Sequence, residues 1–409
     1  MPSSPLHAFH VIGLTHRTAP VRVREQLVLT TAEAAAWLDQ QRAGGRCAAV
    51  LSTCNRFEVY WTGSYDLEPW FHELARARGI EPGTAVVRRD GVACVRHLYQ
   101  VAAGLDSQIV GETEILGQVR RAHQAALEAG TSSRELDAMF SGAIAAGRRV
   151  RRETRLGKHP ASVSSAAVEV ALAAMPQYES TTVIILGAGE VAAGVVRALV
   201  ERGVRRVIVV NRRQERAAAL AEKWEVQSRP WTDLSLLLPI ADLVFVTTGA
   251  KHPLLRADDL AAATARRWSE LVVLDLAVPR NVEPAARRLP RVHLFDLDDL
   301  QNLCCPAAGE PSIAVAEAER IIEDESKRLE ATLQARAAAP KLVHLHQLGE
   351  QLAREEADRA LTGLHHLSDM ERQIVRDMAH RLVRRVLYPV SRRFRDILPA
   401  DTAGARWTA

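Results

Sequence analysis

The stretch TTVIILGAGEVAAGVVRALVERG, residues 181–203, decides the fold of the central part of the chain. A short apolar run leads into Gly187, Ala188, Gly189, Glu190, Val191 and Ala192, and an apolar helical pattern follows at once. This is the G-x-G-x-x-A form of the dinucleotide fingerprint, in the strand–turn–helix context that the motif requires. The glycines permit a tight turn and a close approach of the backbone to a pyrophosphate, which the free N–H groups of the helix start would bind. Small-residue turns also occur for packing alone, but this context favours cofactor binding.

The end of the next predicted strand, Arg206–Val210, indicates which dinucleotide binds. Asn211, Arg212 and Arg213 follow it, where an NAD site usually places a carboxylate for the ribose 2′-hydroxyl. Arginine instead accommodates a 2′-phosphate, so the sequence favours NADPH over NADH. The alternative is that both arginines belong to a solvated loop.

The fold class that we predict is a multidomain α/β chain. Strand and helix alternate over residues 159–307, which predicts a Rossmann-type parallel sheet. Residues 1–158 mix strands and helices (α+β), and residues 308–409 read as helical. The predicted strands are His7–Leu14, Cys47–Cys54, Thr182–Leu186, Arg206–Val210, Leu243–Thr247, Leu271–Leu276 and Val292–Phe295; the predicted helices include Thr31–Gln41, capped by Thr30 or Thr31, and Ala314–Ala338, which we expect Pro340 to end.

Composition excludes several classes of protein. The net charge of +4 over 409 residues is too small for a polycationic nucleic-acid binder, although local basic patches remain. Five scattered cysteines without a CxxC pair argue against a disulfide framework and favour a reducing compartment. No uncharged apolar run reaches the roughly 18 residues that a membrane span needs, and the first residues lack a basic signal segment. We expect a cytoplasmic enzyme with no metal site, because no His, Cys or Asp cluster has zinc spacing.

Cys54 is the candidate nucleophile. It ends an apolar strand beside Arg56, and a nearby arginine can stabilise a thiolate. A cysteine in that place is, however, more often a small core residue. His97 is similarly ambiguous between a packed and an acid–base role, and the bend at Glu112 could hold an ammonium group or simply start a helix.

Two basic stretches also allow two interpretations. Arg148–Arg155 suits contacts to a phosphate backbone, or it is a solvated helix face. In Arg381–Arg395, the residues Leu382, Val386 and Leu387 look like one apolar face that packs on a partner helix.

Taken together, the motifs resemble the glutamyl-tRNA reductase family. GLTHRTAPVRVREQL (13–27), LSTCNRFEVY (51–60), HLYQVAAGLDSQIVGETEILGQV (97–119), SVSSAAVEVA (162–171), LGAGEVA (186–192) and LDLAVPRNVEP (274–284) occur in the family's order. STCNR together with GLDS-x3-GE-x2-ILGQV is highly specific to it.

The resemblance implies a reaction. Such enzymes reduce glutamyl-tRNA(Glu) with NADPH to glutamate-1-semialdehyde, the first step of tetrapyrrole (5-aminolevulinate) synthesis by the C5 route. Cys54 matches the nucleophile that forms a thioester and releases the tRNA, and His97 matches a histidine important for activity. The matched substrate-binding positions are Thr53, Asn55, Arg56, Ser107, Glu112, Thr113, Glu114 and Gln118.

The resemblance also implies an assembly. The family forms a V-shaped homodimer through its C-terminal helices, and a glutamate-1-semialdehyde aminotransferase can receive the product. This chain departs from the family pattern at Glu114, usually Gln, at Thr15, usually Asn or Ser, and at Tyr388, usually His. These departures leave room for a specialised paralogue.

Two alternatives remain open from the sequence. One is a cysteine-using NADP reductase of a small thioester, which would ignore tRNA. The other is a non-catalytic Rossmann scaffold, against which the retained Cys54, Arg56, Ser107 and His97 count.

Overall fold

The computed structural model describes residues 4–81, 83–108, 110–112, 114–154, 156, 162–173, 175, 178–304 and 313–397. The chain forms two compact units. One spans Ala8–Ile322, and the other begins at Glu323 and includes the segment before Ala8. Both described sheets lie in the first unit, and the described part of the second is almost entirely helical.

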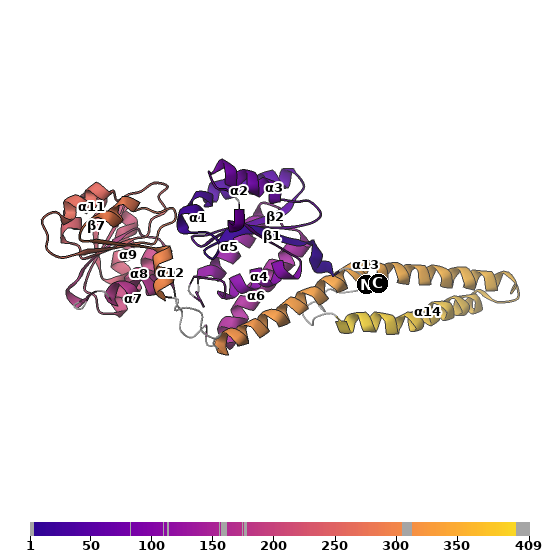
Figure 1. Cartoon of the computed structure of the whole chain (residues 1–409). Coiled ribbons are helices and arrows are strands. Elements are labelled where there is room, and N and C mark those ends of the chain that lie inside the picture. The colour runs from indigo at the N-terminus through magenta and orange to yellow at the C-terminus, as the bar shows by residue number, and fades with distance from the viewer. Residues whose placement is uncertain are drawn as a thin grey trace. The chain divides into compact units, whose positions relative to one another are not determined.

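The first sheet is antiparallel and has the strand order β2-β3-β1-β4. Figure 1 labels β1 and β2 of this sheet, together with helices α1 to α6. Phe57 and Val59 contribute to a core with Trp37 and Phe71, from helices α2 and α3. On the other face Tyr60 meets Phe140 of α6 edge-on, with ring centroids 5.5 Å apart. Because helices cover both faces, every residue of β3 is buried. The elements are β1 (Phe9–Thr15), β2 (Cys47–Ser52), β3 (Arg56–Thr62), β4 (Val87–Asp90), α1 (Val21–Leu27), α2 (Thr31–Ala43), α3 (Glu68–Ala77), α4 (Val92–Ala103), α5 (Glu114–Glu128) and α6 (Arg134–Glu153).

The sequence predicts most of this region. The strands at His7–Leu14 and Cys47–Cys54 are confirmed with small shifts, and the helix that begins at Thr31 is capped by Thr30. Thr30 Oγ1 accepts a hydrogen bond from the Glu33 N–H, and Glu33 accepts one from the Thr30 N–H, which is a capping box. The strand β3 is not among the predicted strands, because two charged residues make it look like a polar turn.

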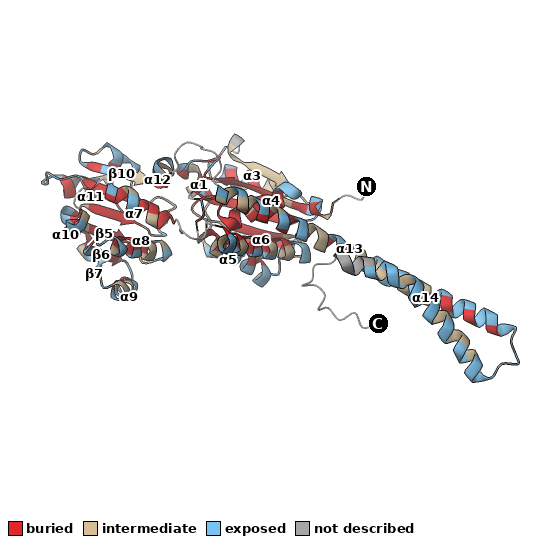
Figure 2. Ribbon diagram, turned by 90° about the horizontal axis from the view of Figure 1, so that it is seen from below, coloured by how far each residue is buried: buried red, intermediate tan, exposed pale blue. Residues whose placement is uncertain are grey.

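The second sheet is parallel, with the order β10-β9-β8-β5-β6-β7. Read from β7, this is the Rossmann order, which confirms the predicted fold class. One buried cluster packs α7, α8 and α12 on one face, and another packs α10 and α11 on the other. Figure 2 shows the strands as the most buried layer. The elements are α7 (Val163–Ala173), β5 (Thr182–Leu186), α8 (Glu190–Glu201), β6 (Arg206–Asn211), α9 (Gln214–Trp224), β7 (Gln227–Pro230), α10 (Leu234–Leu237), β8 (Leu243–Val246), α11 (Ala257–Thr264), β9 (Leu271–Asp275), β10 (Val292–Asp296) and α12 (Leu297–Cys304).

Two long helices complete the described chain, α13 (Ile313–Thr362) and α14 (Asp369–Ile397). The prediction that Pro340 ends the first of them is wrong, since α13 continues through Pro340. A proline removes one backbone hydrogen bond at a cost of about 3 kcal/mol, and the long flanking runs of Ala, Leu, Glu and Arg keep their own bonds. Leu382 and Val386 of α14 are exposed, whereas a Cβ on Gly349 of α13 would meet Leu387 at 3.1 Å. The three apolar residues of the C-terminal stretch therefore do not share one packed face within the chain.

Candidate active site

Cys54 lies in the turn that joins β2 to β3. The Thr53 N–H donates to the Arg56 carbonyl oxygen at 2.9 Å and closes the turn. The Thr53 hydroxyl accepts hydrogen bonds from the N–H groups of Asn55 and Arg56, at 3.1 and 3.2 Å. Thr53 therefore fixes the turn from both ends, and Cys54 stands between two regular strands with little freedom of its own.

The surroundings of Cys54 keep it protonated at rest. The side chain is half-buried and packs against the core cluster of the parallel sheet. Burial, followed by the charge of Glu112, raises the pKa of the Cys54 thiol to about 12, against the opposing effect of Arg24. The arginine that favours the thiolate is thus Arg24, and not the neighbour in sequence, Arg56, that the sequence suggested.

Arg56 points into the interior and is engaged there through both of its terminal nitrogens. Its Nη1 lies 3.2 Å from Glu58 Oε1 and 3.0 Å from Asp106 Oδ2, and its Nη2 donates to the Asp106 carbonyl oxygen. Only 1% of the side chain is exposed, so the two carboxylates compensate a charge that water cannot reach. Asp106 is shared with the half-exposed Arg17, whose Nε lies 2.8 Å from its other oxygen.

His97, on α4, reaches the same cluster through Glu58. The His97 Nε2 lies 2.6 Å from Glu58 Oε1, and the Tyr60 hydroxyl donates to the other oxygen at 2.7 Å. Burial alone would raise the pKa of the Glu58 carboxyl, but His97 and Arg56 outweigh it and hold that pKa at about 2. His97 therefore orients the carboxylate that orients Arg56, and both side chains are almost fully buried.

A second group of acidic residues follows α4. The chain turns back at Gly104, whose φ is +77° and where a Cβ would lie 2.9 Å from the Glu112 carbonyl oxygen. Ser107 and Glu112 are buried, and burial together with Glu114 raises the pKa of the Glu112 carboxyl to about 7. Burial and Glu190 also raise the pKa of Glu114. Carboxylates that raise one another's pKa in this way are suited to binding a cation such as an ammonium group.

A further predicted substrate position belongs to the same region. Gln118 is half-buried on α5, one turn after Glu114, so the two side chains share a helix face. Thr113 lies outside the residues that the structure describes.

The nucleotide fingerprint has the shape that a dinucleotide needs. Gly187 has a φ of +124°, and a Cβ there would lie 2.5 Å from Thr247 Oγ1, so only glycine fits between β5 and β8. A Cβ on Gly189 would meet nothing within 4 Å, which leaves the approach to this backbone open. Gly189 is the N-cap of α8 and offers no side-chain cap to the first N–H groups of the helix. Ala192 is fully buried, as close helix–strand packing requires. Free helix N–H groups beside an open glycine face, at the point where the strand order reverses, fit a pyrophosphate.

The predicted ribose end lies at the end of β6. Asn211 holds this turn, since its Nδ2 donates to the Arg213 carbonyl oxygen at 3.0 Å. The Arg212 guanidinium lies over the Trp231 ring, 5.9 Å from its centroid, and Arg213 is exposed. Both arginines are therefore exposed, and Arg212 in addition lies over a tryptophan ring.

Sequence reasoning missed three residues of this site. Glu58 and Asp106 compensate Arg56, and Arg24 donates to the Cys54 carbonyl oxygen from a fully buried position. Arg24 occurs within the motif GLTHRTAPVRVREQL, but its spacing looks like an ordinary surface helix. Only the three-dimensional structure brings it to Cys54.

The basic stretch at the end of α6 is partly committed to other contacts. Arg149 and Arg152 both pair with Glu153, and Arg151 donates to the Glu112 carbonyl oxygen at 3.2 Å. Arg148 is exposed, while Arg155 and Lys158 fall outside the described residues. Contact with a phosphate backbone therefore stays a prediction for this stretch.

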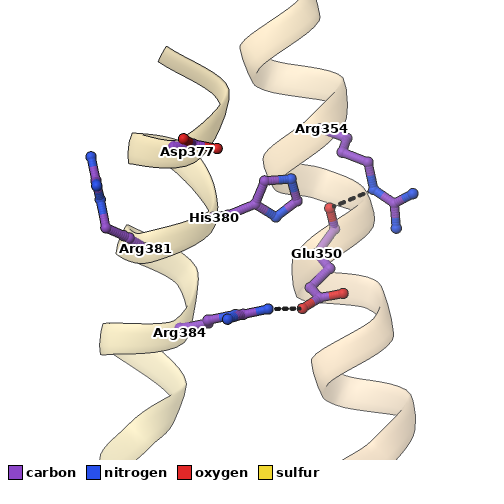
Figure 3. A pocket seen from close by; sticks show the side chains of 6 residues that line it. All are labelled: Glu350, Arg354, Asp377, His380, Arg381 and Arg384. Carbon is purple, nitrogen blue, oxygen red and sulfur yellow. Dashed lines mark hydrogen bonds and ion pairs between the residues drawn. The ribbon is translucent and has the colours of Figure 1, made fainter. Parts of the chain in front are cut away.

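A polar cavity of about 560 Å³ lies elsewhere, between α13 and α14 (Figure 3). An ion pair between Glu350 and Arg384 crosses it, with 3.5 Å between their nearest oxygen and nitrogen atoms. Its lining is entirely ionisable and holds no cysteine, so we do not assign it to the reaction: Glu350, Arg354, Asp377, His380, Arg381 and Arg384.

The described residues form neither a cluster of metal-ligating side chains nor a helix that could span a membrane. They contain no group of three or more His, Cys, Asp or Glu side chains that could hold a metal ion. Within the same residues, none of the helices has the length and apolar character needed to cross a membrane.

Comparison with known proteins gives a consistent pattern along the chain. Residues 12–154 match the family model of the glutamyl-tRNAGlu reductase N-terminal domain, residues 169–303 that of shikimate/quinate 5-dehydrogenase, and residues 317–406 that of the glutamyl-tRNAGlu reductase dimerisation domain. Glutamyl-tRNA reductase from Pelotomaculum thermopropionicum is 36% identical over 92% of this chain and 87% of its own. The enzyme from Desulforudis audaxviator is 38% identical over 93% and 88%. The solved glutamyl-tRNA reductase from Methanopyrus kandleri is 30% identical over 95% of this chain and 98% of its own, with a TM-score of 0.46.

Proposed function

The chain belongs to the glutamyl-tRNA reductase family, and from this premise we propose that it reduces glutamyl-tRNA(Glu) to glutamate-1-semialdehyde, the first step of tetrapyrrole synthesis by the C5 route. The observation that carries the proposal is a cysteine held at a fixed turn near Glu112 and Glu114, in a chain whose residues 12–154 and 317–406 match the family's models.

We propose Cys54 as the nucleophile. Its sulfur would attack the ester carbon, form a C–S bond and break the C–O bond to the tRNA. The thiol proton ends on the departing ribose oxygen, so the step is balanced. Because the pKa of the thiol is raised to about 12 at rest, the attack requires that this proton leave in the same step or just before it.

The residues around Cys54 would hold the glutamyl group. Glu112 and Glu114 supply the negative charge that an α-ammonium needs, and binding it would reduce their effect on the thiol. Thr53, Asn55, Ser107, Thr113 and Gln118 complete the proposed pocket.

Arg56 would bind the substrate's side-chain carboxylate in place of Asp106, which would have to leave the Nη1 of this buried guanidinium to admit it. We assign His97 as a positioning residue, since it acts on Arg56 through Glu58.

The match to a dehydrogenase model indicates that the cofactor is a pyridine nucleotide. The open backbone face at Gly189 leaves room for it. When bound, it provides the hydride that the thioester carbon accepts as the electron pair of the C–S bond returns to sulfur. We propose NADPH, held by residues 187–192 and at its 2′-phosphate by Arg212 and Arg213, with Asn211 shaping that turn.

For the organisation of the chain we propose a catalytic domain at 1–158, a nucleotide domain at 159–307 and a helical domain at 308–409. The last matches a dimerisation domain, which supports a homodimer. A cytoplasmic location and a glutamate-1-semialdehyde aminotransferase as a partner complete the proposal.

The experiment that tests the function is a product assay with purified protein, glutamyl-tRNA and NADPH. Cys54→Ser should form no semialdehyde, while Cys47→Ser, a cysteine on the same hairpin, should keep the wild-type rate. If the wild type binds NADPH but consumes no glutamyl-tRNA, the substrate is different or the chain is a scaffold.

A further inference from the structure

Helix α1 makes paired contacts with the nucleotide-binding part of the same unit. Arg24 Nη2 lies 2.5 Å from Asp298 Oδ1, and Asp298 Oδ2 accepts from the Val21 N–H at 2.7 Å. The next residue, Glu25, accepts from Arg280 through its Nη2 at 2.7 Å, its Nε at 3.0 Å and its backbone N–H at 3.0 Å. The consecutive residues Arg24 and Glu25 therefore each pair with a residue of the opposite charge, Asp298 and Arg280 respectively.

Both partners are fixed in the nucleotide-binding part. Arg280 sits in the loop after β9, where Asp275 accepts hydrogen bonds from the backbone N–H groups of Ala277, Asn281 and Val282. Asp298 is in the first turn of α12, and its N–H donates to Asp296 at 3.0 Å. A rigid loop and a helix start thus hold the two charges that α1 contacts.

On the other side, Arg24 is attached to the nucleophile. Its Nη1 donates to the carbonyl oxygen of Cys54 and lies 3.3 Å from Asn55 Oδ1, and its Nε donates to the Ala19 carbonyl oxygen at 3.0 Å. The Cys54 side chain itself packs against the core of the parallel sheet. One buried guanidinium therefore joins the nucleophile's backbone to Asp298.

We propose that α1 is the latch that fastens the nucleotide-binding part over Cys54, through Arg24–Asp298 and Glu25–Arg280. This inference rests on the proposed function in one respect, the fate of the thioester. With the latch closed, water is kept from the thioester and hydride yields the aldehyde. With the latch open, water attacks the same carbon, sulfur leaves, and free glutamate forms.

The first test needs neither cofactor nor tRNA. Alkylation of Cys54 by iodoacetamide is followed by peptide mass spectrometry in the full-length wild type, Glu25→Gln and Arg280→Gln. We use this pair because the side chains of Glu25 and Arg280 are 16% and 23% exposed. Arg24 is fully buried, and its loss endangers folding. We expect both variants to react about tenfold faster, which corresponds to about 1.4 kcal/mol of lost closure.

The two variants also distinguish opening of the α1 contacts from a direct effect of charge on the pKa of the Cys54 thiol. Removing a negative charge near a thiol lowers its pKa, and removing a positive charge raises it. Charge effects alone would therefore make Glu25→Gln faster and Arg280→Gln slower. The exchange Glu25→Arg with Arg280→Glu should return the rate toward that of the wild type.

The matched control is Arg202→Gln, which breaks a 2.6 Å ion pair with Glu169 within the nucleotide-binding part. It should leave the alkylation rate unchanged. Equal rates in the wild type and both latch variants, or opposite changes in the two, would overturn the inference.

The second test measures the ratio of glutamate to semialdehyde formed from glutamyl-tRNA with NADPH. Latch variants should raise that ratio while they consume glutamyl-tRNA at the wild-type rate. An unchanged ratio counts against the latch. If the wild type consumes no glutamyl-tRNA, the proposed function fails, and the alkylation rates still decide the latch.

Discussion

The replacement Glu58→Gln tests whether the buried ion cluster under the nucleophile stabilises the antiparallel sheet. Glutamine has the shape of protonated glutamate, so the change removes the charge and little volume. The pKa of the Glu58 carboxyl is lowered from an ordinary 4.5 to about 2. At about 1.36 kcal/mol per pKa unit, this stabilises the folded protein by about 3 kcal/mol at neutral pH. Loss of one partner from a buried pair costs a similar amount, about 3–5 kcal/mol.

The assay is native-state hydrogen exchange of the peptide that spans β3, which reports the opening of this sheet alone. Because the pKa of Glu58 is lower in the folded state, its contribution to the free energy of unfolding is complete above about pH 4.5. This contribution is lost as the pH falls toward 2. Glu68→Gln is the control, since this carboxylate is 37% exposed in its pair with Arg88 and its loss should cost less than about 1 kcal/mol. A loss below about 1 kcal/mol for Glu58→Gln at pH 7, or one equal to that of the control, would refute the reasoning.

Three further changes test the other parts of the site. Glu112→Gln should speed alkylation of Cys54 above pH 7 by up to about tenfold, because the carboxylate raises the thiol pKa; below pH 6 the two proteins should react alike, since the Glu112 pKa is about 7. Gly187→Ala should abolish nucleotide binding measured by calorimetry, whereas Gly203→Ala, also at positive φ but in open space, should retain it. Arg213→Ser should weaken NADPH more than NADH in the same titration, and an equal loss for both would remove it from the 2′-phosphate site.

The parallel sheet was predictable because its evidence is local. A buried strand, the glycine turn and the apolar helix are consecutive between Thr182 and Glu201, and the structure confirms the strand on each side. The turn at Cys54 was also readable from the strand that precedes it. These features depend on neighbours in sequence, which pattern reasoning sees directly.

The charge balance of the site was not predictable in the same way. Arg56 and Glu58 look solvent-facing on β3, and their burial depends on Asp106 and His97, each about 40 to 50 residues away in sequence. The partner of Arg24, Asp298, is separated from it by 274 residues. Pairing over such distances leaves no periodic signal, so a compensated interior charge cannot be told from a surface one.

The raised pKa of Cys54 has a protective side. Peroxides and other oxidants attack the thiolate, and a thiol with a pKa of about 12 is ionised at neutral pH in only about one molecule in 10⁵. We therefore expect the resting protein to oxidise at Cys54 more slowly than at an ordinary exposed cysteine. Burial and Glu112 together cause this protection, so we expect it to weaken when a bound cation offsets the acidic charge and to return when the site empties.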